Sequence, residues 1–190
     1  MGEPPEIREI DNVEELRALA DPLRLAILAT LGTDGPDGEL AVMSVKELAQ
    51  RLGEPQTKLY RHVKQLEAAG LIHVAATRMV SGILEQRYQA RQRDLRLSAG
   101  LVRGHADEAE AAIRTAFDSF LEGLFDWARK NGWPEDAPDK PVMCVVENHV
   151  TPESAERIRA RLEKVSGEIS ELTEPGDVPI RAVMSFYQQG

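Results

Sequence analysis

Two short helices joined by a tight turn are predicted within residues 44–69, and this feature constrains the fold more than any other. Ser44 and Glu47 have the spacing of a capping box, in which the two side chains satisfy backbone N–H groups of the first helical turn. Gly53 is suited to end this helix, and Pro55 fixes the entry into the next one. A second helix presented in this way can enter the major groove of DNA.

The second helix, predicted over residues 56–69, has an apolar side and a basic side. Leu59, Val63 and Leu66 recur at steps of four and three residues, which predicts the buried stripe. The other side holds polar and basic side chains that can pair with base edges or with phosphates. The predicted DNA-contacting residues on this side are Gln56, Thr57, Lys58, Tyr60, Arg61 and Lys64. His62 lies beside the stripe, where a packed histidine is favoured over a DNA contact.

A β-hairpin is predicted after the second helix, with strands at residues 71–78 and 84–91. Arg78 and Arg87 flank its predicted tip, so the hairpin forms a wing over residues 78–87. We expect the wing to touch the DNA backbone through these two arginines. Simple surface exposure of both side chains is the alternative.

Charge is distributed unevenly along the chain. The net charge is −9, yet residues 41–97 contain ten Lys or Arg and five Asp or Glu, so this segment carries +5 and the remainder −14. Exposed charges more than about 8–10 Å apart are largely screened at physiological salt, so the local sign decides where a polyanion docks. A basic segment in an acidic chain therefore favours a single docking face.

The residues before this segment are predicted to form a loose acidic arm, residues 1–10, followed by two helices. A helical pattern begins near Asn12. A further helix begins after Asp21, a favoured N-cap, with Pro22 at its first helical position. A short strand is possible at residues 40–43.

A long amphipathic helix is predicted over residues 98–131. Its apolar stripe keeps helical spacing throughout, and such a stripe outside a small domain must be buried somewhere. We expect a partner subunit to cover it. The predicted dimer-interface residues are Val102, Ala109, Ile113, Phe117, Phe120 and Leu124. Aromatic residues gather near the end of this helix, which suits either interface packing or a pocket for a small-molecule effector.

The C-terminal residues, 141–190, are predicted to form a strand-helix-strand unit that dimerises or senses an effector. The helix begins after Thr151, and the strands occupy residues 142–150 and 180–187. Two strands make a thin core, so this unit is expected to complete its sheet against another segment or subunit. The chain is therefore predicted to be mostly α with small β elements (α+β). Its parts are a winged helix-turn-helix at 1–97, the long helix and this unit.

Neither catalysis nor a cofactor is indicated by the sequence. No catalytic triad, paired acids or nucleotide-binding glycine motif stands out, and Cys144 is the single cysteine. His105 and Glu108 have helical spacing that would suit a metal site completed by a second subunit, which is the weaker reading. No apolar run is long enough to span a membrane and no signal peptide is recognised, so we expect a cytoplasmic protein.

Four segments together resemble a known family of proteins. Leu19–Leu28, Ser44–Ala49, Leu59–Leu66 and Ala69–Ile72 resemble the winged-helix module of ArsR-type bacterial transcriptional regulators, over about residues 12–92. The resemblance implies a homodimer, a double-stranded DNA operator with two half-sites, and repression relieved by an effector. Metal-sensing members often carry a Cys-x-Cys pair on the first helix of the DNA-binding pair, and this chain has none there.

These observations favour a dimeric, sequence-specific DNA-binding transcriptional regulator that acts as a repressor. A different class of function remains open, in which the winged helix docks proteins and the chain is a scaffold without DNA binding. A regulator that responds to metal through His105 and Glu108 is a further alternative.

Overall fold

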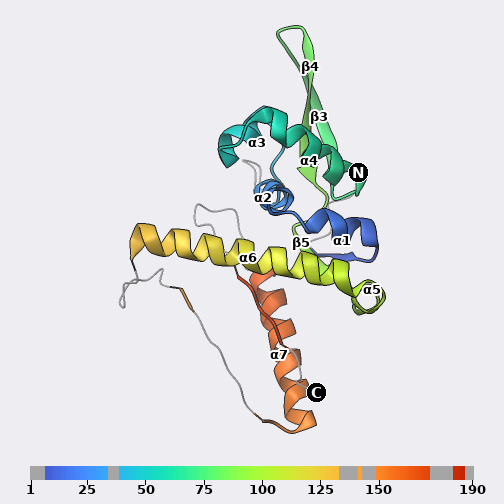
Figure 1. Ribbon diagram of the computed structural model, residues 1–190, viewed down its shortest axis with the longest axis vertical. Coiled ribbons are helices and arrows are strands. Elements are labelled where there is room, and N and C mark those ends of the chain that lie inside the picture. The colour runs from blue at the N-terminus through green and yellow to red at the C-terminus, as the bar shows by residue number, and fades with distance from the viewer. Residues whose placement is uncertain (1–6, 34–38, 133–140, 143–148, 172–181, 187–190) are drawn as a thin grey trace. The chain divides into compact units, whose positions relative to one another are not determined.

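A computed structural model describes the protein in two compact units, Met1–Asp118 and Ser119–Gly190 (Figure 1). The first unit contains the sheets and most of the helices, and the second contains the end of a long helix and one further helix. The described residues are 7–33, 39–132, 141–142, 149–171 and 182–186.

The first two helices begin where the sequence predicts them. α1 spans Val13–Leu19 and α2 spans Pro22–Leu31. Asn12 and Asp21 are their N-caps, and each side chain accepts a hydrogen bond at 2.9 Å from a backbone N–H three residues later. These bonds satisfy donors that have no partner inside a helix, which fixes both starting points.

The helix pair of the helix-turn-helix consists of α3, Val45–Leu52, and α4, Gln56–Ala68. The capping box is present, since the Ser44 N–H donates to Glu47 Oε2 at 2.7 Å and the Glu47 N–H donates to Ser44 Oγ at 3.3 Å. Gly53 ends α3 with φ of 67°, a left-handed conformation that costs glycine little. The predicted boundaries of both helices are therefore confirmed to within about one residue.

The wing is an antiparallel hairpin of β3, Ile72–Val80, and β4, Ile83–Ala90, and the short strand β2, Met43–Ser44, lies on the other side of β4. The turn contains only Ser81 and Gly82, whose φ angles of 50° and 80° are both positive. Positive φ at both central residues belongs to type I′ turns, which match the twist of paired strands. The strands therefore extend further toward the tip than predicted.

The N-terminal arm is not loose over residues 7–10, and this prediction was wrong. β1, Ile7–Ile10, pairs in parallel with β5, Asp94–Leu97. Ile10 is completely buried, and the Arg8 guanidinium donates to the backbone oxygen of Gly70 at 2.7 Å. The backbone of this segment pairs with a strand 87 residues away in the sequence. Local sequence patterns do not reveal such a distant partner.

Two other strand predictions also need correction. The strand expected at 40–43 is limited to β2, which starts at Met43. Residues 182–186 alternate as a strand would but carry no strand in the structure. A strand persists only where a neighbour pairs with its backbone, and alternation in sequence does not provide that neighbour. Most of the other predicted C-terminal strand, 143–148, lies outside the described residues.

The predicted continuous helix at 98–131 is interrupted. α5 spans Ala99–Gly104 and α6 spans Ala106–Asn131, with His105 between them at φ −140° and ψ 58°. The His105 carbonyl accepts the Ala109 N–H at 2.9 Å, so it starts the second helix while ending the first. Gly104, a poor helix former, precedes the break.

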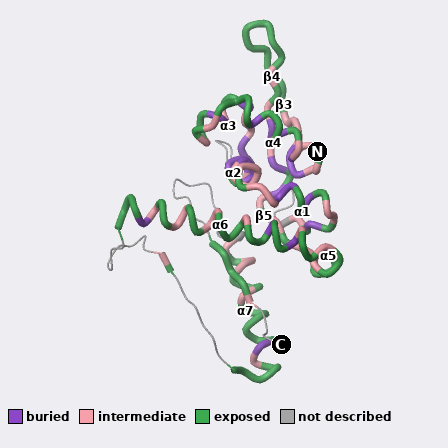
Figure 2. Tube along the Cα trace, in the orientation of Figure 1, coloured by how far each residue is buried: buried purple, intermediate pink, exposed green. Residues whose placement is uncertain are grey.

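α5 and the start of α6, which flank this break, pack against the core of the first unit. That unit therefore extends past the expected boundary at residue 97. Leu101 of α5 is buried, as are Ala109 and Ala112 of α6. Together with the completely buried side chains of α1–α4 and β3, they form one hydrophobic cluster (Figure 2). Its fully buried large apolar members are Ile10, Leu16, Ile27, Leu31, Leu48, Leu59, Val63, Leu66, Leu71 and Ile72.

The second unit contains α7, Pro152–Glu171, which begins after Thr151 as predicted. The Thr151 hydroxyl accepts a hydrogen bond from the Ser154 N–H at 3.2 Å. Among the described residues of this unit, the buried apolar side chains are those of Ala128 and Ala155. In the described part of the whole chain we find no helix with the length and apolarity that a bilayer crossing requires.

Candidate nucleic-acid interface

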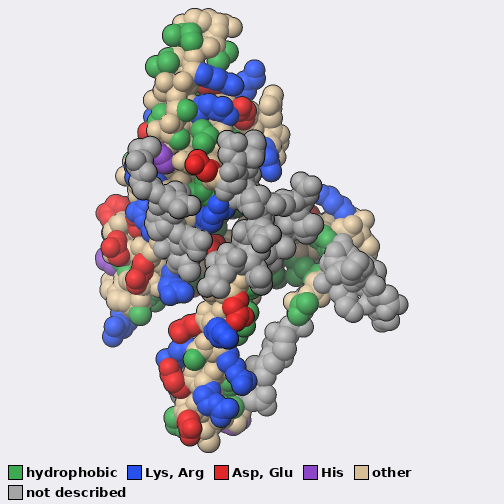
Figure 3. All heavy atoms as spheres, turned by 180° about the vertical axis from the view of Figure 1, so that it is seen from behind, with side chains coloured by type: hydrophobic (Ala, Val, Ile, Leu, Met, Phe, Trp, Pro, Cys, Tyr) green, Lys and Arg blue, Asp and Glu red, His purple; other side chains and the backbone are tan. Residues whose placement is uncertain are grey.

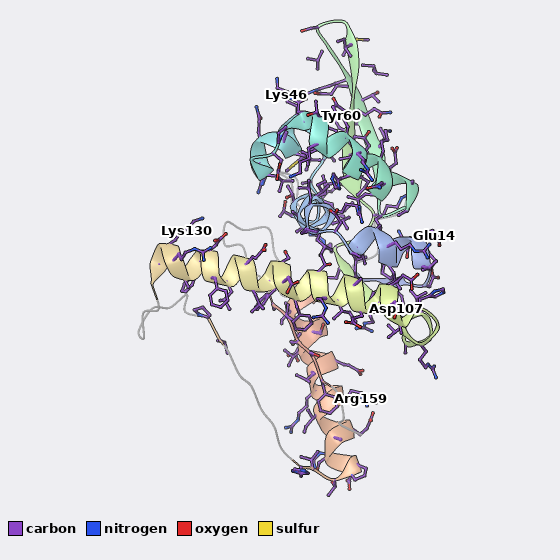
Figure 4. The ribbon with its side chains drawn as sticks, in the orientation of Figure 1. Glu14, Lys46, Tyr60, Asp107, Lys130 and Arg159 are labelled. Carbon is purple, nitrogen blue, oxygen red and sulfur yellow. The ribbon has the colours of Figure 1, made fainter. Side chains whose placement is uncertain are left out.

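The outer face of α4 contains all six residues predicted to contact DNA, and all six are exposed: Gln56, Thr57, Lys58, Tyr60, Arg61 and Lys64. Tyr60 leaves 53% of its surface in water, a large fraction for an aromatic side chain. Figure 4 shows Tyr60 with Lys46 of α3 on the side of the helix pair away from α2. One side of α4 thus presents an amide, a hydroxyl, an aromatic ring and three cationic side chains.

The opposite face of α4 holds the helix rigidly against α2. His62 lies at this interface, as predicted for a packed histidine, with Nδ1 3.4 Å from Asp21 Oδ1. The Arg24 guanidinium donates to Gln65 Oε1 at 2.9 Å and to the backbone oxygen of Ala18 at 2.5 Å. Because polar contacts reinforce the buried apolar stripe, the orientation of the exposed face is set by the core.

Two of the three cations on this face are engaged within the free protein. Lys58 Nζ lies 2.8 Å from Glu54, and Lys64 Nζ lies 2.6 Å from Glu67. The hydrogen bond with Glu67 raises the pKa of Lys64 above its usual value. No ion pair joins Arg61 to any residue in the described part of the chain. Binding a phosphate through either lysine therefore requires exchange of partners, whereas Arg61 can act directly.

Arg78 lies on the wing directly opposite Glu85 in the strand register. Its Nε donates to Glu85 Oε2 at 2.5 Å, and its NH2 group lies 3.7 Å from Glu47 of α3. The side chain remains 45% exposed. It is therefore accessible to a phosphate, although two carboxylates already compete for it.

Arg87 does not flank the tip of the wing, contrary to the predicted geometry. It lies opposite Ser44 of β2, near the base of the hairpin. Its NH2 group donates to the Val42 carbonyl at 2.6 Å and lies 3.2 Å from Glu47 Oε2. The difference arises because the turn comprises only two residues, so the strands are longer and Arg87 lies several pairs from the tip. Its contacts join β4 to the start of α3.

Glu47 connects the capping box to both wing arginines. Partial burial raises the pKa of its carboxyl group, but hydrogen bonds from Ser44 and the charges of Arg87 and Arg78 outweigh this effect, so the pKa is lowered. The charged form is thus favoured in the folded protein. A single carboxylate thus both caps the start of α3 and pairs with one arginine from each strand of the wing.

The tip of the wing has a feature that the sequence analysis missed. Four large apolar side chains flank the turn: Met79, Val80, Ile83 and Leu84, which are 68, 40, 72 and 61% exposed. The available signal was the Ser81–Gly82 dipeptide, a common turn marker whose glycine adopts positive φ readily, because a turn of these two residues leaves apolar residues at both strand ends. Figure 3 shows hydrophobic side chains at this end of the molecule, with basic side chains below them.

The predicted dimer-interface residues do not share one environment. Val102 and Ala109 pack against the core of the first unit, because the break at His105 turns both helices onto it. Ile113 and Phe117 are exposed, and Phe120 and Leu124 are partly buried. Leu121, which was not predicted, and Phe125, one of the aromatic residues near the end of the helix, are also exposed and continue the steps of four residues from Ile113 and Phe117. The apolar surface on α6 therefore begins at Ile113.

Glu108, one of the two residues of the metal-binding alternative, has another partner in this structure. Glu108 accepts a hydrogen bond from Arg17 at 2.9 Å, and this bond lowers the pKa of its carboxyl group. Across the described ranges of the chain, no group of three or more His, Cys, Asp or Glu side chains is placed to hold a metal ion. In this structure Glu108 joins α1 to α6.

Comparison with known proteins adds one finding to this geometry. No curated protein matches the chain. Residues 19–75 match a family model described as a helix-turn-helix domain, and this segment runs from the end of α1 into β3. The match includes the capping box, both helices of the pair and the exposed face of α4. The chain thus carries a helix-turn-helix domain within a mostly helical α+β protein, which indicates a DNA-binding regulator.

Proposed function

We propose that the protein is a sequence-specific transcriptional repressor that binds a double-stranded DNA operator as a homodimer. The observation that carries the proposal is the outer face of α4, on which all six candidate DNA-contacting residues are exposed while the inner face is locked to the core. In this proposal α4 lies in the major groove, and the wing lies beside the adjoining backbone.

The residues of α4 divide by chemistry into readers and anchors. Gln56 can pair with adenine and Arg61 with guanine, each worth about 1–3 kcal/mol of discrimination when the contact is bidentate. Lys58 and Lys64 are suited to phosphates, which position the protein without specifying sequence. The acidic partners of the two lysines would be released on binding, so part of the electrostatic gain offsets the loss of internal ion pairs.

Dimerisation is supported by the uncovered apolar side chains of α6. Ile113, Phe117, Leu121 and Phe125 follow one another at steps of four residues, and each is 39–50% exposed. A helix with such a stripe is stabilised when a partner covers it. A second copy would supply the same stripe, because a two-fold interface joins the same surface patch of both subunits. Two copies of α4 could then occupy major grooves about 34 Å apart on one DNA face.

Repression is supported by the resemblance to ArsR-type regulators. An effector would act by favouring a dimer arrangement in which the two α4 helices no longer match the spacing of the half-sites. The single cysteine of the chain argues against thiolate-based metal sensing. We therefore propose a small organic effector, if the regulator is ligand-controlled, rather than a metal ion.

The direct test is selection from a random duplex DNA library, followed by fluorescence anisotropy with the selected sequence over a salt series. The variant Lys58→Glu/Arg61→Glu should lose at least about a hundredfold in affinity, because it replaces two DNA contacts by repulsion. Its salt slope should fall, since fewer counterions are released. The matched control Arg159→Glu/Lys164→Glu makes the same charge change on α7 and should bind normally.

The outcomes separate the regulator from the scaffold. Selection of a two-fold symmetric consensus, lost with Lys58→Glu/Arg61→Glu while sedimentation shows an unchanged oligomer, supports the regulator. Failure of the wild-type protein to enrich any sequence, at low salt and over several rounds, would reject DNA reading and favour a protein-docking scaffold. A reporter gene downstream of the selected site then tests the sign of regulation, and repression predicts lower expression when the protein is present.

A further inference from the structure

Both lysines on the outer face of α4 are bound by a glutamate of the same chain. Lys58 Nζ lies 2.8 Å from Glu54, which precedes the helix, and Lys64 Nζ lies 2.6 Å from Glu67 in its last turn. Each glutamate side chain is 30% exposed, so both carboxylates lie beside the outer face and not beneath it. The exposed Arg61 lies between the two pairs in sequence.

Helix stability does not account for Glu67. An acidic side chain in the last turn of a helix faces the negative end of the helix dipole. A lysine that precedes its glutamate is also the less stabilising order of such a pair. The hydrogen bond from Lys64 to Glu67 is nevertheless the largest influence on the pKa of this lysine, which it raises. The effect of Glu67 therefore falls on the lysine and not on the helix.

A carboxylate so close to the ammonium group obstructs a phosphate. A charge-assisted hydrogen bond from Lys64 Nζ to a phosphate oxygen spans about 2.8 Å, and Glu67 lies 2.6 Å from the same nitrogen, so the two anionic oxygens would be at most about 5.4 Å apart. This separation is shorter than the screening length of about 8 Å at physiological salt, so the two anions repel each other. The lysine must therefore leave its glutamate to hold DNA at full strength.

The exchange of partners depends on the DNA sequence. Where Gln56 and Arg61 pair with their bases, the register of α4 on the duplex is fixed, and each lysine can turn to a defined phosphate. On other sequences nothing fixes the register, and the lysines can keep their glutamates. Binding to such DNA relies on phosphate contacts alone, so it is weakened most when two cations stay paired.

We propose that Glu54 and Glu67 are specificity-determining residues, which hold the two lysines back from DNA of the wrong sequence. This specificity role rests on the proposed function and adds to it two residues that touch no base. Each carboxylate lowers the affinity for competing DNA more than the affinity for the operator. The ratio of these two affinities decides occupancy of the operator, because a genome offers a vast excess of other sites.

The test compares Glu54→Gln/Glu67→Gln, Lys58→Gln/Lys64→Gln and all four changes together by fluorescence anisotropy over a salt series. The probes are the selected operator and a scrambled duplex of the same length. The glutamate variant should bind the scrambled duplex at least about tenfold more tightly, with a steeper salt slope, because up to two more phosphates are engaged. Its affinity for the operator should rise less than about threefold, with an unchanged salt slope, because both lysines already hold phosphates there.

Two comparisons separate this role from a general effect of charge. In the Lys58→Gln/Lys64→Gln background the glutamate changes should tighten binding to the scrambled duplex no more than about twofold, since no lysine remains to be released. Glu156→Gln/Glu168→Gln makes the same charge change in the second unit, at two glutamates that also pair with cations, and should alter neither affinity. Circular dichroism of each variant verifies that the helices are folded.

Each result has a definite meaning. A lower ratio of operator to scrambled affinity, which returns to normal when the lysines are absent, supports the proposal. An equal gain on both duplexes, or no gain on the scrambled duplex, overturns it while leaving the proposed function intact. A gain that persists without the lysines also overturns it and assigns the effect to net charge. Failure of the wild-type protein to select any sequence rejects the proposed function first, and this specificity role with it.

Discussion

The first unit buries leucine and isoleucine side chains completely, whereas the described part of the second unit buries alanines. In Met1–Asp118 the core includes Leu48, Leu59 and Leu66, none of which is exposed at all. In the described residues of Ser119–Gly190, large apolar side chains such as Leu121, Phe125 and Val165 are instead 42–50% exposed. One chain therefore combines a unit with its own core and a unit whose large apolar side chains, among the residues that the structure describes, are mostly exposed in part.

The two units differ in how they acquire stability. Full burial of a leucine side chain contributes about 1.5–3 kcal/mol, and each such residue helps to offset the conformational entropy lost by the first unit. Alanine has little apolar surface to bury, so the second unit gains much less from its own packing. We infer that the second unit depends on a partner surface, which the proposed dimer would supply.

Separating the units should have the largest effect on stability. A chain of residues 1–118 is expected to unfold cooperatively, because its hydrophobic cluster lies entirely within those residues. A chain of residues 119–190 should remain largely unfolded at micromolar concentration, since its described core consists of Ala128 and Ala155. Thermal unfolding followed by circular dichroism checks both chains. A sharp, concentration-independent unfolding transition of residues 119–190 would show instead that the second unit has a stable core of its own.

Matched truncations of one leucine in each unit should differ strongly. Leu59→Ala removes a completely buried side chain and should destabilise the first unit by about 2–5 kcal/mol. Leu121→Ala removes a side chain that is 42% exposed and should change the stability of the monomer by less than about 1 kcal/mol. Urea unfolding measures both values.

The same pair of variants also tests the proposed dimer. Leu121→Ala should weaken self-association in sedimentation experiments, whereas Leu59→Ala should not do so under conditions where it is folded. The two tryptophans, Trp127 and Trp133, both belong to residues 119–190, so their fluorescence follows the second unit. A tryptophan transition that does not depend on protein concentration would argue against stabilisation by a partner copy.

Removing one helix cap in each unit should have an intermediate effect. Ser44→Ala loses the reciprocal bonds with Glu47 at a completely buried position and should cost the first unit about 1–2 kcal/mol. Thr151→Ala loses the bond to the Ser154 N–H at an exposed position, and should cost α7 about 0.5–1 kcal/mol. Urea unfolding measures the first and helical circular dichroism the second. Equal losses of global stability would show that the units are coupled more tightly than their cores indicate.

Local signals account for what the sequence predicted correctly. The N-caps Asp21 and Ser44, the helix end at Gly53, and the exposed face of α4 follow from side-chain chemistry or periodicity within a few residues. The six α4 residues were predicted to be exposed because the buried stripe of the helix leaves that face to solvent. These features depend on neighbours in the sequence, so one sequence suffices to find them.

Long-range contacts account for most of the features that the sequence did not predict. The pairing of β1 with β5 joins residues far apart in the chain, and the break at His105 allows two helices to pack on one core. Arg87 was predicted at the tip, but its contacts with Val42 and Glu47 depend on how β4 lies against α3. Periodicity within a segment carries no information about any of these partners.

Neutralising one carboxylate in each unit should have the smallest effect and a characteristic pH dependence. The pKa of Glu47 is lowered in the folded protein, so its ionisation contributes stability that is present above the ordinary value of 4.5 and is lost as the pH falls through the folded value. Glu47→Gln preserves a capping-box residue but removes the charge beside Arg78 and Arg87. At pH 7 it should cost a few tenths to about 1 kcal/mol, because the group is partly screened by water.

On acidification the difference between this variant and the wild-type protein should disappear, since both then carry a neutral side chain at residue 47. The control Glu168→Gln removes an exposed carboxylate that lies 3.2 Å from Lys164 in the second unit, and its urea unfolding curve should follow the wild type at every pH. Urea midpoints from pH 7 down to about pH 2 test this, because the lowered pKa of Glu47 requires a pH well below its ordinary value of 4.5. A difference in urea midpoint between Glu47→Gln and wild type that persists at the lowest pH would mean that Glu47 stabilises α3 through the geometry of its capping box. The charge of Glu47, which joins the wing to the helix pair, would then contribute little to the stability of the first unit.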